Sequence, residues 1–169
     1  GFMRINSQTN YLEIYYNNAW TSTTYVLGLI TASWVGATAT YSGNFVTLIY
    51  TSSGTFTVTN APIGTTIEYL IVGGGGSGGS ALAANTRGGG GGGAGGYLAG
   101  VTTITSGTAY TVTVGAGGAA VTTLANVGSV GSNSVFTAVA TIALGGGRGA
   151  SETDTVGGSG GSGGGGSGG

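Results

Sequence analysis

Few residues in this chain could do catalytic chemistry. It has three arginines, four carboxylates and no His or Cys. The segment 75–79, Gly-Gly-Ser-Gly-Gly, formally matches the Gly-x-Ser-x-Gly turn that carries a nucleophile. Activation of Ser77 would need a base such as His, and the chain has none. The sequence therefore predicts no hydrolase site and no catalytic residue, and we expect the protein not to be an enzyme.

Binding motifs are equally sparse. Gly73, Gly75 and Gly78 follow an apolar segment and match the dinucleotide fingerprint, but no helical pattern and no acidic residue about 20 positions on accompany them. A phosphate-binding loop would lack its Lys. Glu152 and Asp154 could contribute to a cation site, although a solvated loop is the better interpretation. We predict no cofactor and no metal site.

The composition also limits the partners. Glycine supplies 41 of 169 residues, charged residues make up 4%, and the net charge is -1, so nothing steers the chain towards nucleic acid or an anionic membrane. The apolar runs are far shorter than the ~20 residues of a membrane-spanning helix, and we expect no membrane insertion. The chain lacks an initiator Met and ends in a glycine run, which indicates a segment of a longer polypeptide.

The elements that would position any site are predicted to be strands, since no segment has a helical period. The fold class expected is all-β, a β-sandwich or jelly-roll-like pair of sheets with glycine-rich excursions. We divide the chain into an N-terminal β-hairpin unit (1–22) with a polar loop at 7–10, an extended connector with one or two strands (23–44) and a glycine-rich β domain (45–169). Strands are predicted at 45–50, 55–59 and 66–72, with a turn at 51–54 between the first two. The strand 66–72 is expected to be covered on both faces, because apolar residues lie on both. The segments 97–105 and 109–114 are predicted to form a hairpin.

The glycine runs are either flexible linkers or an ordered lattice of polyglycine-II helices. Ordering six glycines costs on the order of 3 to 6 kcal/mol more than ordering alanines. Threefold helices paired through their backbones could offset that cost. Interruptions three residues apart, at Ser77 and Ser80, at Ala94 and Tyr97, and at Ser159 and Ser162, favour the lattice. The lattice residues predicted are Gly73, Gly74, Gly75, Gly76, Gly88, Gly89, Gly90, Gly91, Gly92, Gly93, Gly145, Gly146 and Gly147. If the runs are packed, Gly91→Val should destabilise the fold.

Three residues beside the glycine runs are candidate receptor contacts. Arg87 and Arg148 each abut a run and could face a ligand, although capping of backbone carbonyls is the simpler role. Tyr97 closes a run, where it could belong to the core or stack on a sugar from an exposed rim.

Several linked motifs resemble the glycine-rich domain of bacteriophage tail-fibre proteins. They are the segment from Ser53 to Val72 leading into glycine, the run Gly88 to Gly96, the segment Tyr110 to Gly118, and the segment Gly131 to Phe136 before the next run. The resemblance covers about residues 50–169. Residues 1–20 are similar to a short hairpin unit common in phage structural and fibre proteins.

The resemblance implies a virion appendage, either a tail fibre or a spike, located on the particle surface. It also implies a homo-oligomer, with a trimer favoured, that contacts other virion proteins and contributes to host attachment through a surface polysaccharide or protein. The alternative is a purely structural virion protein, such as a capsid decoration or appendage scaffold, with no receptor.

Overall fold

The computed structural model describes residues 2–5, 11–16, 19–26, 30–42, 45–82 and 88–168, with the backbone alone for the first three ranges. Its strands are β1 (Phe2–Ile5), β2 (Tyr11–Tyr16), β3 (Ala19–Val26), β4 (Thr31–Ser42), β5 (Phe45–Asn60), β6 (Thr66–Val72), β7 (Tyr97–Thr103), β8 (Thr108–Thr113) and β9 (Val135–Phe136). Within the described residues there is no helix, and all strand pairs are antiparallel. The all-β prediction is confirmed, while a sandwich or jelly-roll arrangement stays a prediction. No helix that could span a membrane occurs in these ranges.

The first sheet has the order β1-β2-β3. Its first two strands occupy the segments predicted for the N-terminal hairpin, and β3 adds a third strand through the pairs Tyr15–Trp20 and Tyr16–Ala19. The polar loop predicted at 7–10 lies outside the described residues.

The predicted connector, 23–44, contains all of β4, and β4 pairs with β5 from Thr31–Asn60 to Ser42–Phe45. The turn expected at 51–54 is instead an irregularity inside β5. The register jumps between Val35 and Ala37, where Gly36 has a left-handed φ of 88°. A Cβ on Gly54 would lie 1.9 Å from Val35 O, so only glycine allows the two strands to cross this closely.

A small hydrophobic core lies between the four-stranded sheet β4-β5-β8-β9 and the hairpin β6-β7. Phe56, Tyr110 and Phe136 meet with ring centroids 5.8 to 6.4 Å apart. Val58 and Ile104 are almost fully buried beside them. The predicted hairpin of β7 with β8 is wrong, because β7 pairs with β6 and β8 pairs with β5 and β9. The chain crosses between the two sheets at Ile104, whose burial ties them together.

The hairpin β6-β7 is covered on one face only. Ile67 and Ile71 pack against the core, whereas Leu70 is 63% and Val72 is 54% exposed. The prediction of cover on both faces is therefore wrong for this chain alone.

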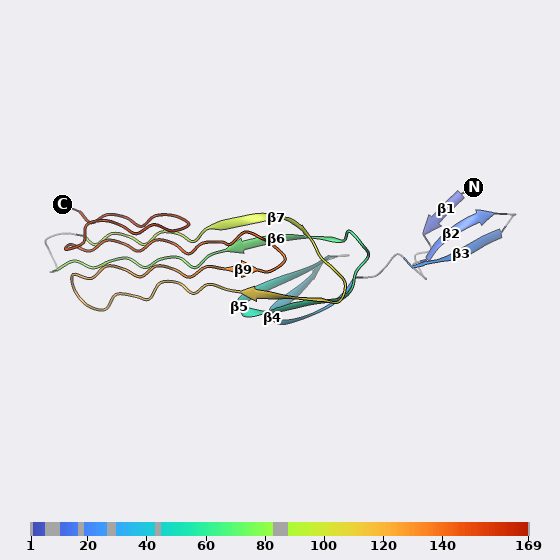
Figure 1. Ribbon diagram of the computed structural model, residues 1–169, viewed down its shortest axis with the longest axis horizontal. Helices are drawn as coiled ribbons and strands as arrows, with labels where there is room; N and C mark the ends of the chain where they lie inside the picture. Colours follow the sequence, from blue (N-terminus) through green and yellow to red (C-terminus); the bar gives the residue numbers. More distant parts are fainter. Residues whose placement is uncertain are drawn as a thin grey trace.

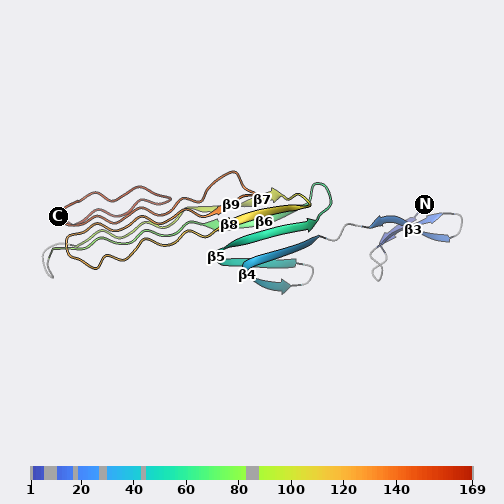
Figure 2. The same ribbon diagram turned by 60° about the horizontal axis from the view of Figure 1, so that its bottom comes forward.

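Beyond these sheets the glycine-rich segments extend side by side in one direction, away from β4 and β5 (Figure 1). The view turned by 60° shows the same bundle of long, gently undulating segments continuing from β6, β7 and β8 (Figure 2).

Candidate functional site: the glycine lattice and its loop end

Seven extended runs form the lattice. They are run 1 (residues 73–80), run 2 (88–96), run 3 (115–119), run 4 (126–134), run 5 (143–150), run 6 (157–161) and run 7 (162–168). Run 1 continues β6 and run 2 leads into β7, so these two extend the β6-β7 hairpin.

Hydrogen bonds between the runs repeat every three residues. The amides of Gly73, Gly76 and Gly79 in run 1 donate to run 2 carbonyls at 2.8 to 2.9 Å. The neighbouring amides Gly74 and Ser77 donate to run 4 instead, each at 2.9 Å. Three residues per turn is the period of the polyproline-II conformation, which has no internal hydrogen bonds and must pair with neighbours. The ordered lattice, and not the flexible linker, is what the described runs form.

Run 5 is the centre of the lattice. It hydrogen-bonds to runs 1, 2, 4, 6 and 7, and its pairings with runs 1 and 7 are parallel. Gly146 and Gly149 donate to Gly74 and Ser77 of run 1, and Gly147 and Ala150 donate to Ser162 and Gly165 of run 7. Gly145, Gly146 and Gly147 are buried. A segment in which four of the eight residues are glycine thus takes the position that a hydrophobic strand would take in an ordinary core.

Glycine is needed in the lattice because the neighbouring backbones leave no room for a Cβ atom. Among the described glycines only Gly36, Gly64 and Gly107 have positive φ, and none of them is in a run. A Cβ on Gly92 would lie 2.1 Å from Gly76 O, and one on Gly146 would lie 2.0 Å from Gly93 O. Most of the predicted lattice glycines are blocked by neighbouring backbone in this way.

Three predicted lattice glycines are not blocked. A Cβ on Gly88 or Gly91 would meet no atom within 4 Å, and one on Gly75 would lie 3.7 Å from Gly93 O. They lie in the runs but point outwards. The expectation that Gly91→Val destabilises a packed lattice is therefore wrong on steric grounds, because Gly91 occupies the open side of its helix.

Ser77 and Ser80 confirm the three-residue period by sharing one side of run 1. The Ser77 hydroxyl donates to Ala119 O at 2.6 Å and accepts the Ser129 amide at 2.8 Å. The Ser80 hydroxyl donates to Thr123 O at 2.7 Å and accepts the Asn126 amide at 3.1 Å. Both hydroxyls join the segment around run 3 to run 4. Ser159 and Ser162 do not share an edge, because a bend at residues 160–162 separates them.

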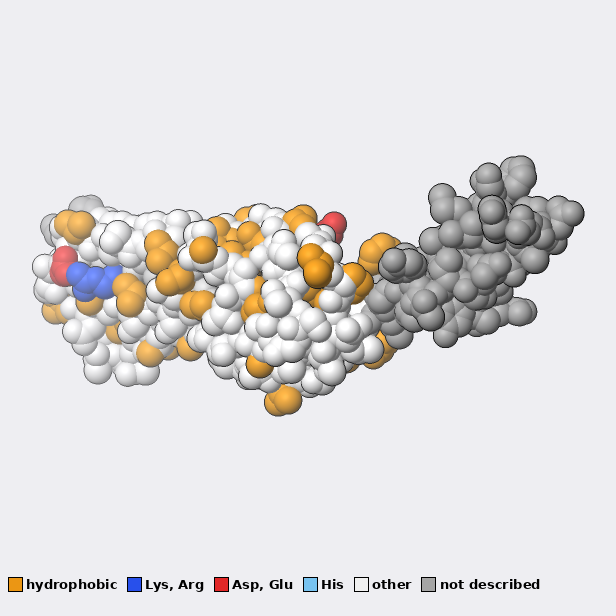
Figure 3. All heavy atoms as spheres, turned by 45° about the vertical axis from the view of Figure 1, so that its right-hand side comes forward, with side chains coloured by type: hydrophobic (Ala, Val, Ile, Leu, Met, Phe, Trp, Pro, Cys, Tyr) orange, Lys and Arg blue, Asp and Glu red, His pale blue; other side chains and the backbone are white. Residues whose placement is uncertain are grey.

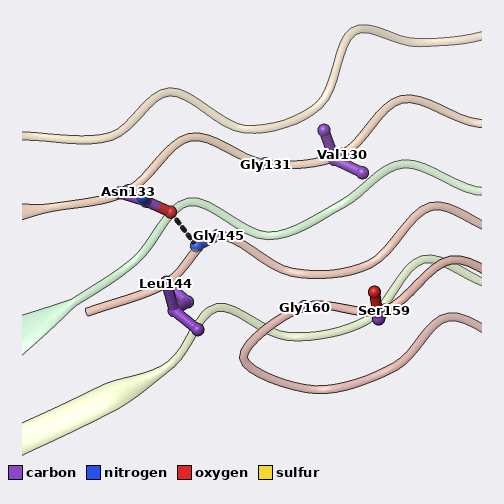
Figure 4. A pocket seen from close by; sticks show the side chains of 7 residues that line it. All are labelled: Val130, Gly131, Asn133, Leu144, Gly145, Ser159 and Gly160. Atoms are coloured by element: carbon purple, nitrogen blue, oxygen red, sulfur yellow. Dashed lines mark hydrogen bonds between the residues drawn. The ribbon is translucent and has the colours of Figure 1, made fainter. Parts of the chain in front are cut away.

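One side of run 5 has no neighbouring run. An open cavity of about 360 Å³ lies there between run 4 and the bend after Ser159, with Val130 and Leu144 on its walls. Asn133 Oδ1 accepts the Gly145 amide at 2.8 Å and replaces the missing backbone carbonyl (Figure 4). Side chains therefore occupy the position beside run 5 where a sixth neighbouring run would fit.

At the end of the lattice away from the sheets lies the loop end, defined as residues 81–82, 121–126 and 151–156 (Figure 1). Its three segments are tied together. The Leu82 amide donates to Glu152 Oε2 at 2.7 Å, and the Ala125 amide donates to Ala81 O at 3.0 Å. The Thr153 hydroxyl donates to Ala125 O at 3.1 Å. Each loop thus contacts at least one other loop.

The charged groups near the loop end serve these internal contacts. Arg148 Nη2 lies 2.9 Å from Asp154 Oδ2, with the two side chains 33% and 46% exposed. Figure 3 shows blue and red side chains meeting at this end of the molecule. Glu152 and Asp154 have different partners, and the described residues contain no cluster of three or more possible metal ligands.

With this geometry in place, the chain can be compared with known proteins. The family described as the glycine-rich domain matches residues 51–169, which is more than half of the chain. The chain belongs to this family. No curated protein matches it, and no solved structure does. The match begins inside β5 and includes β6 to β9 and every run of the lattice, whereas β4 lies before it.

Within this glycine-rich domain, the two candidate receptor contacts that the structure describes, Arg148 and Tyr97, do not form one site. Arg148 lies beside the loop end, paired with Asp154. Tyr97 is 67% exposed at the start of β7, near Leu144, whose carbonyl accepts the Gly96 amide. Arg148 and Leu144 are four residues apart in run 5, so Arg148 and Tyr97 are separated by about 12 Å along the lattice at 3.1 Å per residue. Arg87 lies outside the described residues.

Sequence reasoning missed the exposed apolar residues of the loop end. Leu82 is 51%, Leu124 is 68% and Val156 is 70% exposed. The available signal was their position, since each lies in a connection between two glycine runs. Without a pairing scheme for the runs, the sequence could not show that these connections meet.

Proposed function

We propose that this chain is a structural component of a bacteriophage virion appendage, a tail fibre or spike, and that its loop end contributes to adhesion at the host surface. The tail-fibre resemblance and the chain's membership of the glycine-rich domain family support the structural role. The other partners proposed are further virion proteins and copies of the chain itself, a trimer being what the resemblance implies.

The observation that carries the adhesive part is the loop end. Three connections meet on a rigid backbone lattice and are fastened to one another by the Leu82–Glu152 and Ala125–Ala81 hydrogen bonds. Binding residues are commonly carried on loops that a rigid scaffold positions. The exposed surface combines the apolar side chains of Leu124 and Val156 with threonine hydroxyls and suits an uncharged partner, such as a surface polysaccharide or protein.

Binding of the purified chain to bacterial cells and surface polysaccharides tests the adhesive role. We expect Leu124→Asp and Val156→Asp to weaken binding at least about tenfold, which corresponds to 1.4 kcal/mol. Phe45→Asp is the matched control, because Phe45 is 78% exposed on β5, outside the loop end. Equal binding by all three variants would contradict the role of the loop end.

A specific observation favours the second candidate, a purely structural virion protein such as a capsid decoration or appendage scaffold. The carboxylates of Glu152 and Asp154 and the guanidinium of Arg148 make contacts within the chain. If the wild type binds no cell or polysaccharide and a particle map places it within the virion, the structural role holds and the adhesive one fails.

A further inference from the structure

The outer face of the long hairpin formed by β6, run 1, run 2 and β7 is apolar at one end and carries no side chain larger than the Ala94 methyl group at the other. In the sheet part, the cross-strand pairs Leu70–Ala99 and Val72–Tyr97 point away from the core. Val101 beside them is 61% exposed. We call the residues Leu70, Val72, Tyr97, Ala99 and Val101 the apolar face.

The same side continues along the lattice. Counting three residues at a time, Val72 is followed by Gly75 and Gly78, and Tyr97 is preceded by Ala94 and Gly91. A Cβ at Gly75, Gly78 or Gly91 would have no backbone atom closer than 3.2 Å. The amides of Gly75 and Gly91 donate to no backbone carbonyl in the described chain. This strip presents flat backbone with free donors.

These properties select the partner. The strip carries only the Ala94 methyl group, so close approach to it requires a surface with similarly few and small side chains, because larger side chains would hold the two backbones apart. The apolar face requires an uncharged apolar cover, and Glu68, the cross-strand partner of Val101, is the one charged side chain on the outward side of β6 and β7. A second copy of this chain offers both surfaces in the same order.

We propose that the apolar face and the adjoining strip are the surface through which copies of this chain associate, aligned in the same direction. In this alignment the apolar face of one copy contacts the apolar face of the other, and the lattice strips of the two copies lie side by side. The apolar residues on both faces of β6 are accounted for in this way: Ile67 and Ile71 fill the core, and Leu70 and Val72 fill the interface. The inference rests on the self-association included in the proposed function and names its surface.

Sedimentation velocity of the full chain over a range of concentrations tests this assignment. We expect the wild type to associate and Leu70→Glu/Val101→Glu to associate at least about a hundredfold more weakly, since both charges would be buried. Phe45→Glu adds the same kind of charge at an exposed site on β5 and should behave as the wild type. A wild type that stays monomeric at about 100 µM, or a double variant that associates equally well, overturns the proposal.

A cross-linking experiment covers the case in which the double variant fails to fold. The chain has no Cys, so Ala99→Cys places a single thiol on the apolar face. We expect oxidation to join copies through it, and not through Thr47→Cys on exposed β5. Equal cross-linking of both variants overturns the proposal. Host-cell binding is measured separately, so a monomeric wild type that still binds cells would remove the interface and leave the adhesive role.

Discussion

At the scale of single residues, the direction of a missing Cβ decides which glycines can change. Gly91 and Gly92 are neighbours with the same type of backbone conformation, yet only the Cβ direction of Gly92 is blocked, by run 1. This difference gives a matched pair of substitutions for testing the lattice.

We expect Gly92→Ala to destabilise the fold by about 1 to 3 kcal/mol or more, because a new Cβ would lie 2.1 Å from Gly76 O and must separate runs 1 and 2. In the monomer, Gly91→Ala should be neutral or stabilising by about 0.4 to 1 kcal/mol, since alanine restricts the unfolded chain and fits the open side. Urea denaturation of both variants measures the difference. Equal free energies of unfolding would show that the runs are not packed.

At the scale of elements, two serines take the place of missing backbone contacts. Where the chain leaves run 3, the hydroxyls of Ser77 and Ser80 join that segment to run 4. Ser77→Ala or Ser80→Ala should each cost about 1 to 3 kcal/mol, because two hydrogen bonds of about 0.5 to 1.5 kcal/mol are lost each time. Ser159→Ala is the control, since the exposed Ser159 has no side-chain hydrogen bond in the described structure. A loss no larger than the control's would refute the bridging role.

The ion pair at the loop end should contribute little by comparison. Arg148 and Asp154 are both partly exposed, and solvent screens such pairs. We expect Asp154→Asn to change the free energy of unfolding by less than about 1 kcal/mol, with the effect shrinking at high salt. Thermal unfolding at two salt concentrations checks this. A loss of stability several times larger would mean that the ion pair organises the whole turn from Glu152 to Asp154.

The sequence was informative where side chains alternate or recur. The alternation of Tyr110 and Val112 with threonines predicts β8, and the three-residue spacing of Ser77 and Ser80 predicts their shared side. Which run lies beside which could not be predicted, because glycine has no side chain to mark the face it buries. The same lack of a signal hid the loop end. The pairing of β7 with β6 was missed because it joins strands separated by runs 1 and 2.

At the scale of the whole molecule, two kinds of stabilising interaction hold adjacent parts of the fold. A small aromatic core around Phe56 and Tyr110 holds the sheets, and backbone hydrogen bonds around run 5 hold the lattice. The two parts are connected through one long hairpin, because run 1 continues β6 and run 2 leads into β7.

Amide hydrogen exchange should reveal this continuity. We expect the amides of Gly146, Gly147 and Gly149 to exchange as slowly as those of β5 and β8, although they belong to no strand, because each donates a buried hydrogen bond from the central run. An isolated polyproline-II segment would exchange fast, since its backbone is solvated. Fast exchange at these glycines with slow exchange in β8 would show that the lattice opens independently of the sheets.

The three-residue repeat of the lattice also restricts the insertions that a run can accommodate. Inserting one residue into a run would rotate everything beyond it by about 120°, turning open positions such as Gly91 towards a neighbour and blocked ones such as Gly92 outwards. Inserting three residues would keep every side in place and lengthen the run by one turn. The lattice can therefore lengthen or shorten in triplets, provided that they are added to facing runs together.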